Sequence, residues 1–200
     1  MNPWALNARR DGAPPALALT DAPQMLMKTL TTLLLTLSCL VSSVFGGTLT
    51  ETEADDLKKD INSMMKLFES GNAQALIDHT HEVIFELAGG KEAFEALTKE
   101  AVAQVMKSGV KFLESELGTP TEVHPAGKYE VCFVPRTSVM EFQGRKVKSV
   151  AFMIAARTPG TKTWKYLDGS SLRENPEMLG KLFPDLDPKV VLPTNTVDVL

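Results

Sequence analysis

Cysteine is scarce in this chain of 200 residues, which contains only Cys39 and Cys132. If Cys39 leaves with an amino-terminal signal, as argued below, Cys132 is the only cysteine of the mature chain and no intramolecular disulfide can form. Cys132 stands in an apolar stretch with the pattern of a strand. We therefore interpret it as a small buried hydrophobic residue in preference to a reactive thiol.

Clusters of positive charge are also missing. From Gly47 onward the chain has 18 Lys and Arg against 23 Asp and Glu. Because nucleic acids and anionic membrane surfaces are bound by basic patches, neither is expected as a partner of the mature chain. The sequence also lacks a glycine-rich phosphate loop, a Ser-His-Asp arrangement and a cysteine-based site, and no cofactor is expected.

The amino-terminal 46 residues do not fit a globular domain. Residues 27–46 read MKTLTTLLLTLSCLVSSVFG, in which one Lys precedes a leucine-rich run and then small residues. This order is typical of a secretory signal peptide cleaved near Gly46. Residues 1–26 form a leader that we interpret as a misplaced start or an extension. We expect export to the periplasm or the extracellular space, with a lipoprotein attached through Cys39 as the alternative.

The first part of the mature chain has the pattern of three helices. Apolar residues recur at helical spacing from residue 50 to residue 108. Thr50 and Glu53 fit a capping box at the start of the first helix. Residues 82–88 fit either a helix or a strand and are predicted as helix. Gly89 and Gly90 separate them from the third helix.

From residue 110 the apolar period changes to two, which predicts strands. Pro135 predicts a bulge or an edge within the strand Tyr129–Phe142. The tail from about residue 173 is rich in Pro and has the pattern of one short helix. The predicted fold is α+β, with three amino-terminal helices packed on a strongly curved antiparallel sheet of about four strands, and a short carboxy-terminal helix.

Three stretches of the chain resemble the nuclear transport factor 2-like superfamily, which includes ketosteroid isomerase and the SnoaL-like cyclases. They are FESGNAQAL after the first helix, GGKEAFEAL at the third helix, and KTWKYLDGSSL in the last strand. The resemblance covers about Thr50–Leu172 and implies a single cone-shaped, cystatin-like domain over residues 47–200. Members often dimerise across the sheet, and the fold hosts both enzymes and binding modules.

In such a cone, an Asp or His general base would lie in the pocket between sheet and helices. The segment DHTHE provides the candidates Asp78 and His81, three residues apart on one helical face. The alternative is a solvated helix end. His79 and His81 point apart on a helix and lack a third ligand with recognisable spacing, so no metal site is expected.

The candidate ligand-binding residues come from the predicted pocket. They are His79, Arg136, Arg157, Trp164, Tyr166 and Asp168. The alternative for the two aromatic residues is core packing, and for the arginines it is ion pairing. We expect a non-catalytic module that binds a small apolar or anionic ligand, or that forms a homodimer through the sheet. The alternative is a cofactor-free isomerase or dehydratase.

Overall fold

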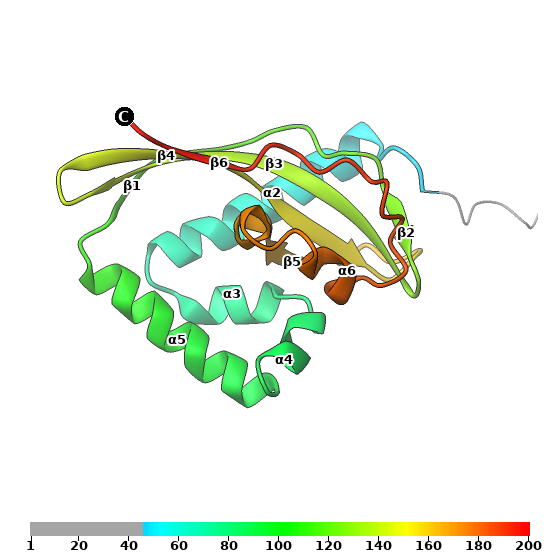
Figure 1. Ribbon diagram of the computed structural model, residues 1–200, viewed down its shortest axis with the longest axis horizontal. Coiled ribbons are helices and arrows are strands. Elements are labelled where there is room, and N and C mark those ends of the chain that lie inside the picture. The colour runs from blue at the N-terminus through cyan, green and yellow to red at the C-terminus, as the bar shows by residue number, and fades with distance from the viewer. Residues whose placement is uncertain (1–45) are drawn as a thin grey trace, which may run out of the picture. The chain divides into compact units, whose positions relative to one another are not determined.

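The computed structural model describes residues 46–200 as an α+β fold (Figure 1). The predicted leader, Cys39 and the signal peptide up to residue 45 lie outside the described residues. The described elements are α2 (Glu51–Glu69), α3 (Ala73–His79), α4 (Val83–Leu87), α5 (Lys91–Lys107), β1 (Lys111–Leu117), β2 (His124–Ala126), β3 (Tyr129–Phe142), β4 (Arg145–Arg157), β5 (Lys165–Asp168), the 3-10 helix η1 (Gly169–Arg173), α6 (Met178–Leu182) and β6 (Thr196–Val199).

Helix α2 begins with the predicted capping box. The Thr50 Oγ1 accepts a hydrogen bond from the Glu53 N–H at 3.3 Å, and the Glu53 carboxylate accepts one from the Thr50 N–H at 3.0 Å. Two N–H groups that the helix leaves without intrahelical partners are thereby satisfied. The buried face of the helix consists of Leu57, Ile61 and Met64.

The second predicted helix is interrupted and forms two helices, α3 and α4. The His81 N–H donates to the Tyr166 carbonyl of β5 at 3.1 Å, and Thr80 forms a bridge with the same residue. The backbone of Thr80 is extended, with φ −70° and ψ 139°, and the N–H of the next residue therefore bonds the end strand of the sheet instead of the preceding helical turn. Residues 83–87 are helical, as predicted.

The sheet is antiparallel and has six strands, so the prediction of about four was wrong in number. Its order is β1-β3-β4-β5, with β2 paired to β3 and β6 paired to β4. The two extra strands, β2 and β6, have only three and four residues, which is too short for a period of two to be recognised in the sequence. Strand β6 pairs with Val147–Val150, a part of β4 that the short β5 leaves uncovered.

Pro135 lies within an unbroken ladder between β3 and β4, so the predicted bulge is absent there. Its carbonyl accepts from the Gly118 N–H at 2.8 Å, where β1 has just ended. Because the N and C=O of one residue point to the same side of an antiparallel strand, the missing N–H of Pro135 costs no bond to β4. The observed register shift is in β1, between Phe112 and Glu114.

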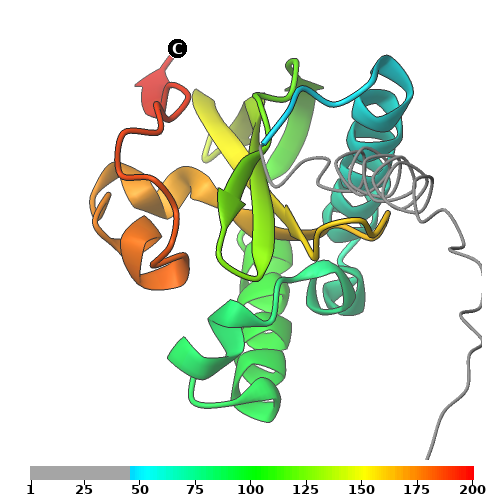
Figure 2. The same cartoon turned by 90° about the vertical axis from the view of Figure 1, so that its right-hand side faces the viewer.

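The β3–β4 hairpin places alternate side chains on two faces, and each face has its own core. On one face, Cys132, Val134 and Met153 pack against α2. On the other face, Phe133, Phe152 and Ile154 pack against the segment of η1 and α6. Figure 2 shows α2 on one side of the sheet and the orange η1–α6 segment on the other. Both faces are therefore covered along this half of the hairpin.

Ile61 tests how strongly α2 holds this arrangement. Its side chain is fully buried against the sheet. We expect Ile61→Ala to lower the free energy of unfolding by about 2–5 kcal/mol, because it removes buried carbons and leaves a cavity. Leu67→Ala on the same helix, at a side chain that is 43% exposed, is the matched control. Urea denaturation of both variants measures the difference, and equal losses would contradict this packing.

Candidate functional site

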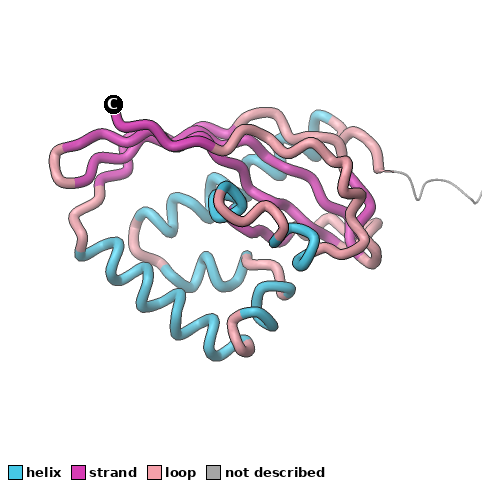
Figure 3. Tube along the Cα trace, in the orientation of Figure 1, coloured by secondary structure: helices cyan, strands magenta, loops and turns pink. Residues whose placement is uncertain are grey.

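A cavity of about 730 Å³ lies between the sheet and helices α2, α3 and α5, and it extends past the end strand β5 to η1 and α6. It exists because α5 packs on α3 and α4 and does not reach the sheet: of its 17 residues, only Val102 is buried. Figure 3 shows α3 and α5 below the strands. Most of the lining is apolar and includes Met64, Met65, Phe68, Leu76, Phe94, Val105, Val110, Phe112, Met140 and Met153.

The sheet wall of the cavity contains a row of serines that sequence inspection missed. Ser115 of β1 is the register partner of Ser138 of β3, which is in turn the partner of Ser149 of β4. All three line the cavity. Side chains opposite one another on one face are neighbours, so three hydroxyls cross the wall in one row. The period-two pattern puts Ser138 and Arg136 on the same face and could have revealed this.

Arg136 lies on this wall, two residues from Ser138, and its side chain is 11% exposed. One terminal nitrogen donates to the Asp168 carboxylate at 3.2 Å, and the other contacts the Met65 sulfur at 3.5 Å. The buried Nε has no hydrogen-bond partner among the described residues. The guanidinium is thus an enclosed cation with few acceptors, which is unusual because buried polar groups are normally paired.

Asp168 is half-exposed at the cavity. Its second carboxylate oxygen accepts from the Ser170 N–H at 2.7 Å and so caps η1. One carboxylate therefore combines two functions, since it pairs with Arg136 and fixes the turn after β5.

Tyr166 lines the cavity but is otherwise part of the core, being 2% exposed. Its hydroxyl donates to the Asp60 carboxylate of α2 at 2.5 Å, and burial raises the pKa of Tyr166. The His79 ring stacks on Tyr166 with 6.3 Å between centroids, and its Nε2 is 3.8 Å from Asp60. These contacts join α2, α3 and β5, so the three residues act as a structural junction.

His81 does not line this cavity. It lines a second, more polar pocket of about 440 Å³, together with Glu82, Lys91, Tyr129 and Lys165. The His81 ring is buried and meets Tyr129 edge-on at 4.5 Å. Desolvation lowers the pKa of His81, so the ring is neutral at pH 7.

The hydrogen bonds of His81 fix its tautomer. Its Nδ1 accepts from the Val83 N–H at 3.1 Å, so the single proton of the neutral ring is on Nε2. The lone pair that a general base needs is already used by the backbone. Asp78, the other catalytic candidate, is exposed, and its carboxylate accepts from Gln74 at 2.8 Å. Its backbone carbonyl accepts from the Lys165 ammonium.

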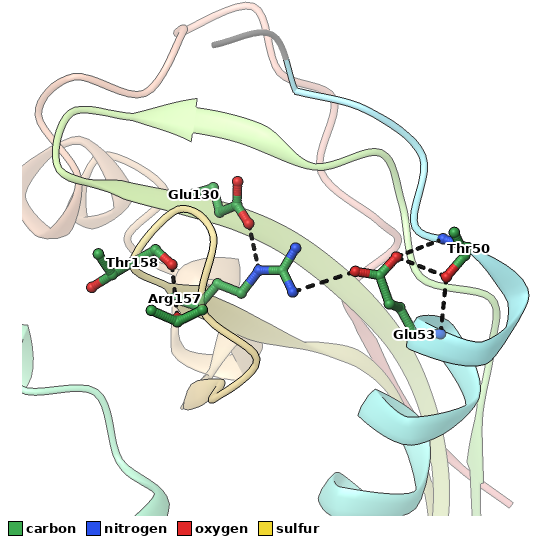
Figure 4. Close-up of polar contacts among 6 residues, drawn as sticks. Thr50, Glu53, Glu130, Arg157 and Thr158 are labelled. Atoms are coloured by element: carbon green, nitrogen blue, oxygen red, sulfur yellow. Dashed lines mark hydrogen bonds and ion pairs between the residues drawn. The ribbon is translucent and has the colours of Figure 1, made fainter. Parts of the chain in front are cut away.

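Arg157 and Trp164 lie outside the cavity lining and contact each other. The guanidinium lies over the Trp164 ring at 4.2 Å. Figure 4 shows it between Glu130 of β3 and Glu53, the carboxylate of the α2 capping box. The Thr50 hydrogen bonds, and to a lesser degree Arg157, lower the pKa of Glu53. Arg157 thus connects the end of β4 to the start of α2 and has its charge neutralised there.

The sequence candidates therefore separate into three places. Arg136, Tyr166 and Asp168 meet at the cavity; Asp78, His81 and Arg157 line the second pocket; Trp164 lines neither and is buried in the core beneath the Arg157 guanidinium. Within residues 46–200, no group of three His, Cys, Asp or Glu side chains could hold a metal ion. None of the helices in that range is long and apolar enough to span a membrane.

Comparison of the chain with protein-family models, with curated proteins and with solved structures finds no match.

The neutral His81 predicts a pH dependence of stability. The unfolded chain takes up a proton on this residue near pH 6.5, whereas the folded chain resists it, so the free energy of unfolding falls as the pH drops below about 6.5. We expect His81→Gln to flatten this fall, and His79→Gln to leave it in place. Urea denaturation at about pH 7.5 and about pH 5.5 measures both slopes. A slope in His81→Gln as steep as in the wild type would contradict the assignment.

Proposed function

We propose that this chain is an exported nuclear transport factor 2-like domain that binds a small, largely apolar ligand without transforming it. The observation that carries the proposal is the cavity of about 730 Å³ between sheet and helices. Its volume is within the range of about 300–1,000 Å³ of small-molecule sites, which combine apolar walls with a few polar groups. The described lining has this composition.

The arrangement of the elements supports the superfamily part of the proposal. Within residues 46–200, four helices precede an antiparallel sheet, and the cavity opens between the two, where a cone-shaped domain would hold its ligand. The long β3–β4 hairpin forms one wall, and the detached α5 forms the opposite one. We propose in addition that the sheet is strongly curved and gives the domain the shape of a cone.

Binding is favoured over catalysis because the described lining offers no base that is both enclosed and unpaired. Asp168 is paired with Arg136, and the Tyr166 hydroxyl donates a hydrogen bond to Asp60. The other lining carboxylates, Glu69 and Glu114, are partly or fully exposed. Cys132 lies on the same face but is buried, and burial raises its pKa to about 12. A general base or nucleophile needs an accessible lone pair at working pH, and the one buried neutral imidazole, His81, belongs to the second pocket.

A cavity-filling variant tests the proposal. Thr98 of α5 lines the cavity, and its neighbour Leu97 is 58% exposed and does not. We expect the purified protein to bind the neutral dye Nile red, Thr98→Trp to weaken this binding at least about tenfold, and Leu97→Trp to leave it unchanged. Fluorescence titration measures the dissociation constants. No saturable binding to the wild type, or equal loss in both variants, would contradict the proposal.

Export is tested by the amino terminus of the mature protein. The signal-like run ending at Gly46 predicts cleavage near this residue. Intact mass spectrometry of the protein isolated from outside the cytoplasm is expected to give a chain beginning close to Gly47. An uncleaved leader would contradict the signal peptide, and a lipid-modified chain beginning at Cys39 would show the lipoprotein alternative instead.

A further inference from the structure

We propose that the cavity selects an apolar ligand with a single carboxylate, and that Arg136 is the residue that binds the carboxylate. This inference rests on the proposed ligand-binding function and adds the chemical class of the ligand. It starts from the fact that Arg136 is the one lining residue that places a positive charge deep in a mostly apolar cavity; the other lining cation, Arg173, is exposed.

The guanidinium is incompletely paired. Arginine has five N–H donors, and the described residues give acceptors to two: a carboxylate oxygen of Asp168 and the thioether of Met65, a weak acceptor. The enclosed Nε has none. A buried cation with unsatisfied donors is costly, and the cost is relieved when an anion enters beside it. The cavity therefore favours a ligand that brings a hydrogen-bond acceptor to the Arg136 guanidinium.

The surroundings of Arg136 indicate the shape of this ligand. The hydroxyls of Ser138 and Ser149 lie along the same wall and can donate to a second carboxylate oxygen. The helical side facing them provides Met65, Phe68 and Val105, which suit a hydrocarbon body. Arg136, Ser138 and Ser149 thus form one polar group on a wall whose other residues include Met140 and Met153, which favours a ligand with one polar end.

The remaining charges of the lining are mostly negative, since three carboxylates stand against the single exposed cation Arg173, and they favour a ligand with one negative charge. Glu69 and Glu114 are partly or fully exposed at the cavity, and Asp168 is 49% exposed. A ligand with a second carboxylate would bring it toward these side chains, and like charges repel. A dicarboxylate is therefore expected to bind less well than a monocarboxylate of the same length.

Asp168 is a competitor for the ligand. Its carboxylate occupies a terminal nitrogen of Arg136, so an incoming carboxylate must share or displace it. Asp168→Asn removes the competing charge while keeping a side-chain oxygen that can cap the Ser170 N–H. Substitutions of Arg136 and Asp168 should therefore have opposite effects. Loss of the Arg136 charge weakens carboxylate binding, and loss of the Asp168 charge strengthens it.

The experiment measures displacement of Nile red from the purified protein by decanoate, 1-decanol and decanedioate. In the wild type we expect decanoate to bind about tenfold more tightly than the other two. Arg136→Met is expected to bring decanoate to the level of decanol. Arg136→Lys is expected to keep part of the preference, and Asp168→Asn to increase it about threefold or more.

The outcomes separate the two proposals. If neither decanol nor decanoate displaces bound dye, or if no dye binds, the proposed function fails. If decanol and decanoate bind equally to the wild type, or if decanoate keeps its preference in Arg136→Met, the carboxylate inference is overturned while the binding function stands. If thermal unfolding shows Arg136→Met to be unfolded, Asp168→Asn decides, and unchanged or weaker decanoate binding there overturns the inference.

Discussion

The long β3–β4 hairpin is the constraint on which the rest of the structure depends. Its pairing runs without a register shift from Glu130–Arg157 to Phe142–Arg145. Successive residues of each strand therefore point to opposite faces of the sheet along its whole length. Near the open ends of the strands both faces are covered, by α2 and by the η1–α6 segment. Toward the turn between the strands, the alternate residues that share the face of Arg136 line the cavity. One rigid ladder therefore provides both the core and the binding wall.

The cavity depends on a second feature, the way in which α5 is held. This helix packs on α3 and α4 instead of on the sheet, and its buried face is correspondingly small. A helix that met the sheet would fill the space with its own side chains and would stabilise the protein by burying more apolar area. The open space, with an incompletely paired arginine in it, is a cost to stability of the kind expected at functional sites.

Much of the fold could be predicted from the sequence because its signals are local. The capping box of Thr50 and Glu53, the helical period of α5 and the alternation of β3 each involve neighbouring residues. The misses depend on contacts that are distant in sequence. His81 is not helical because its N–H bonds the Tyr166 carbonyl of the sheet. Strand β6 pairs with residues of β4 that no other strand covers on that side.

In the candidate site, too, local patterns were predictable and contacts between distant residues were not. Arg136, Tyr166 and Asp168 were selected as strand residues, and the strand register brings them to the cavity. Asp78 and His81 were both predicted to line the cavity, but both line the second pocket, and the turn between α3 and α4 leaves His81 with its Nδ1 bonded to the backbone. Arg157 was selected for its charge, and the ion pairs that neutralise it come from β3 and α2.

Methionine-methyl NMR spectra of the purified protein, recorded during addition of decanoate, test the central claim most directly. The cavity is lined by Met64, Met65, Met140, Met153 and Met178, whereas Met106 of α5 lies outside it. Binding in the cavity predicts saturable shifts of the lining methyl groups, largest for Met65 beside Arg136, with Met106 unchanged. Shifts confined to Met106, or no saturable shift at the lining methionines, would contradict the account.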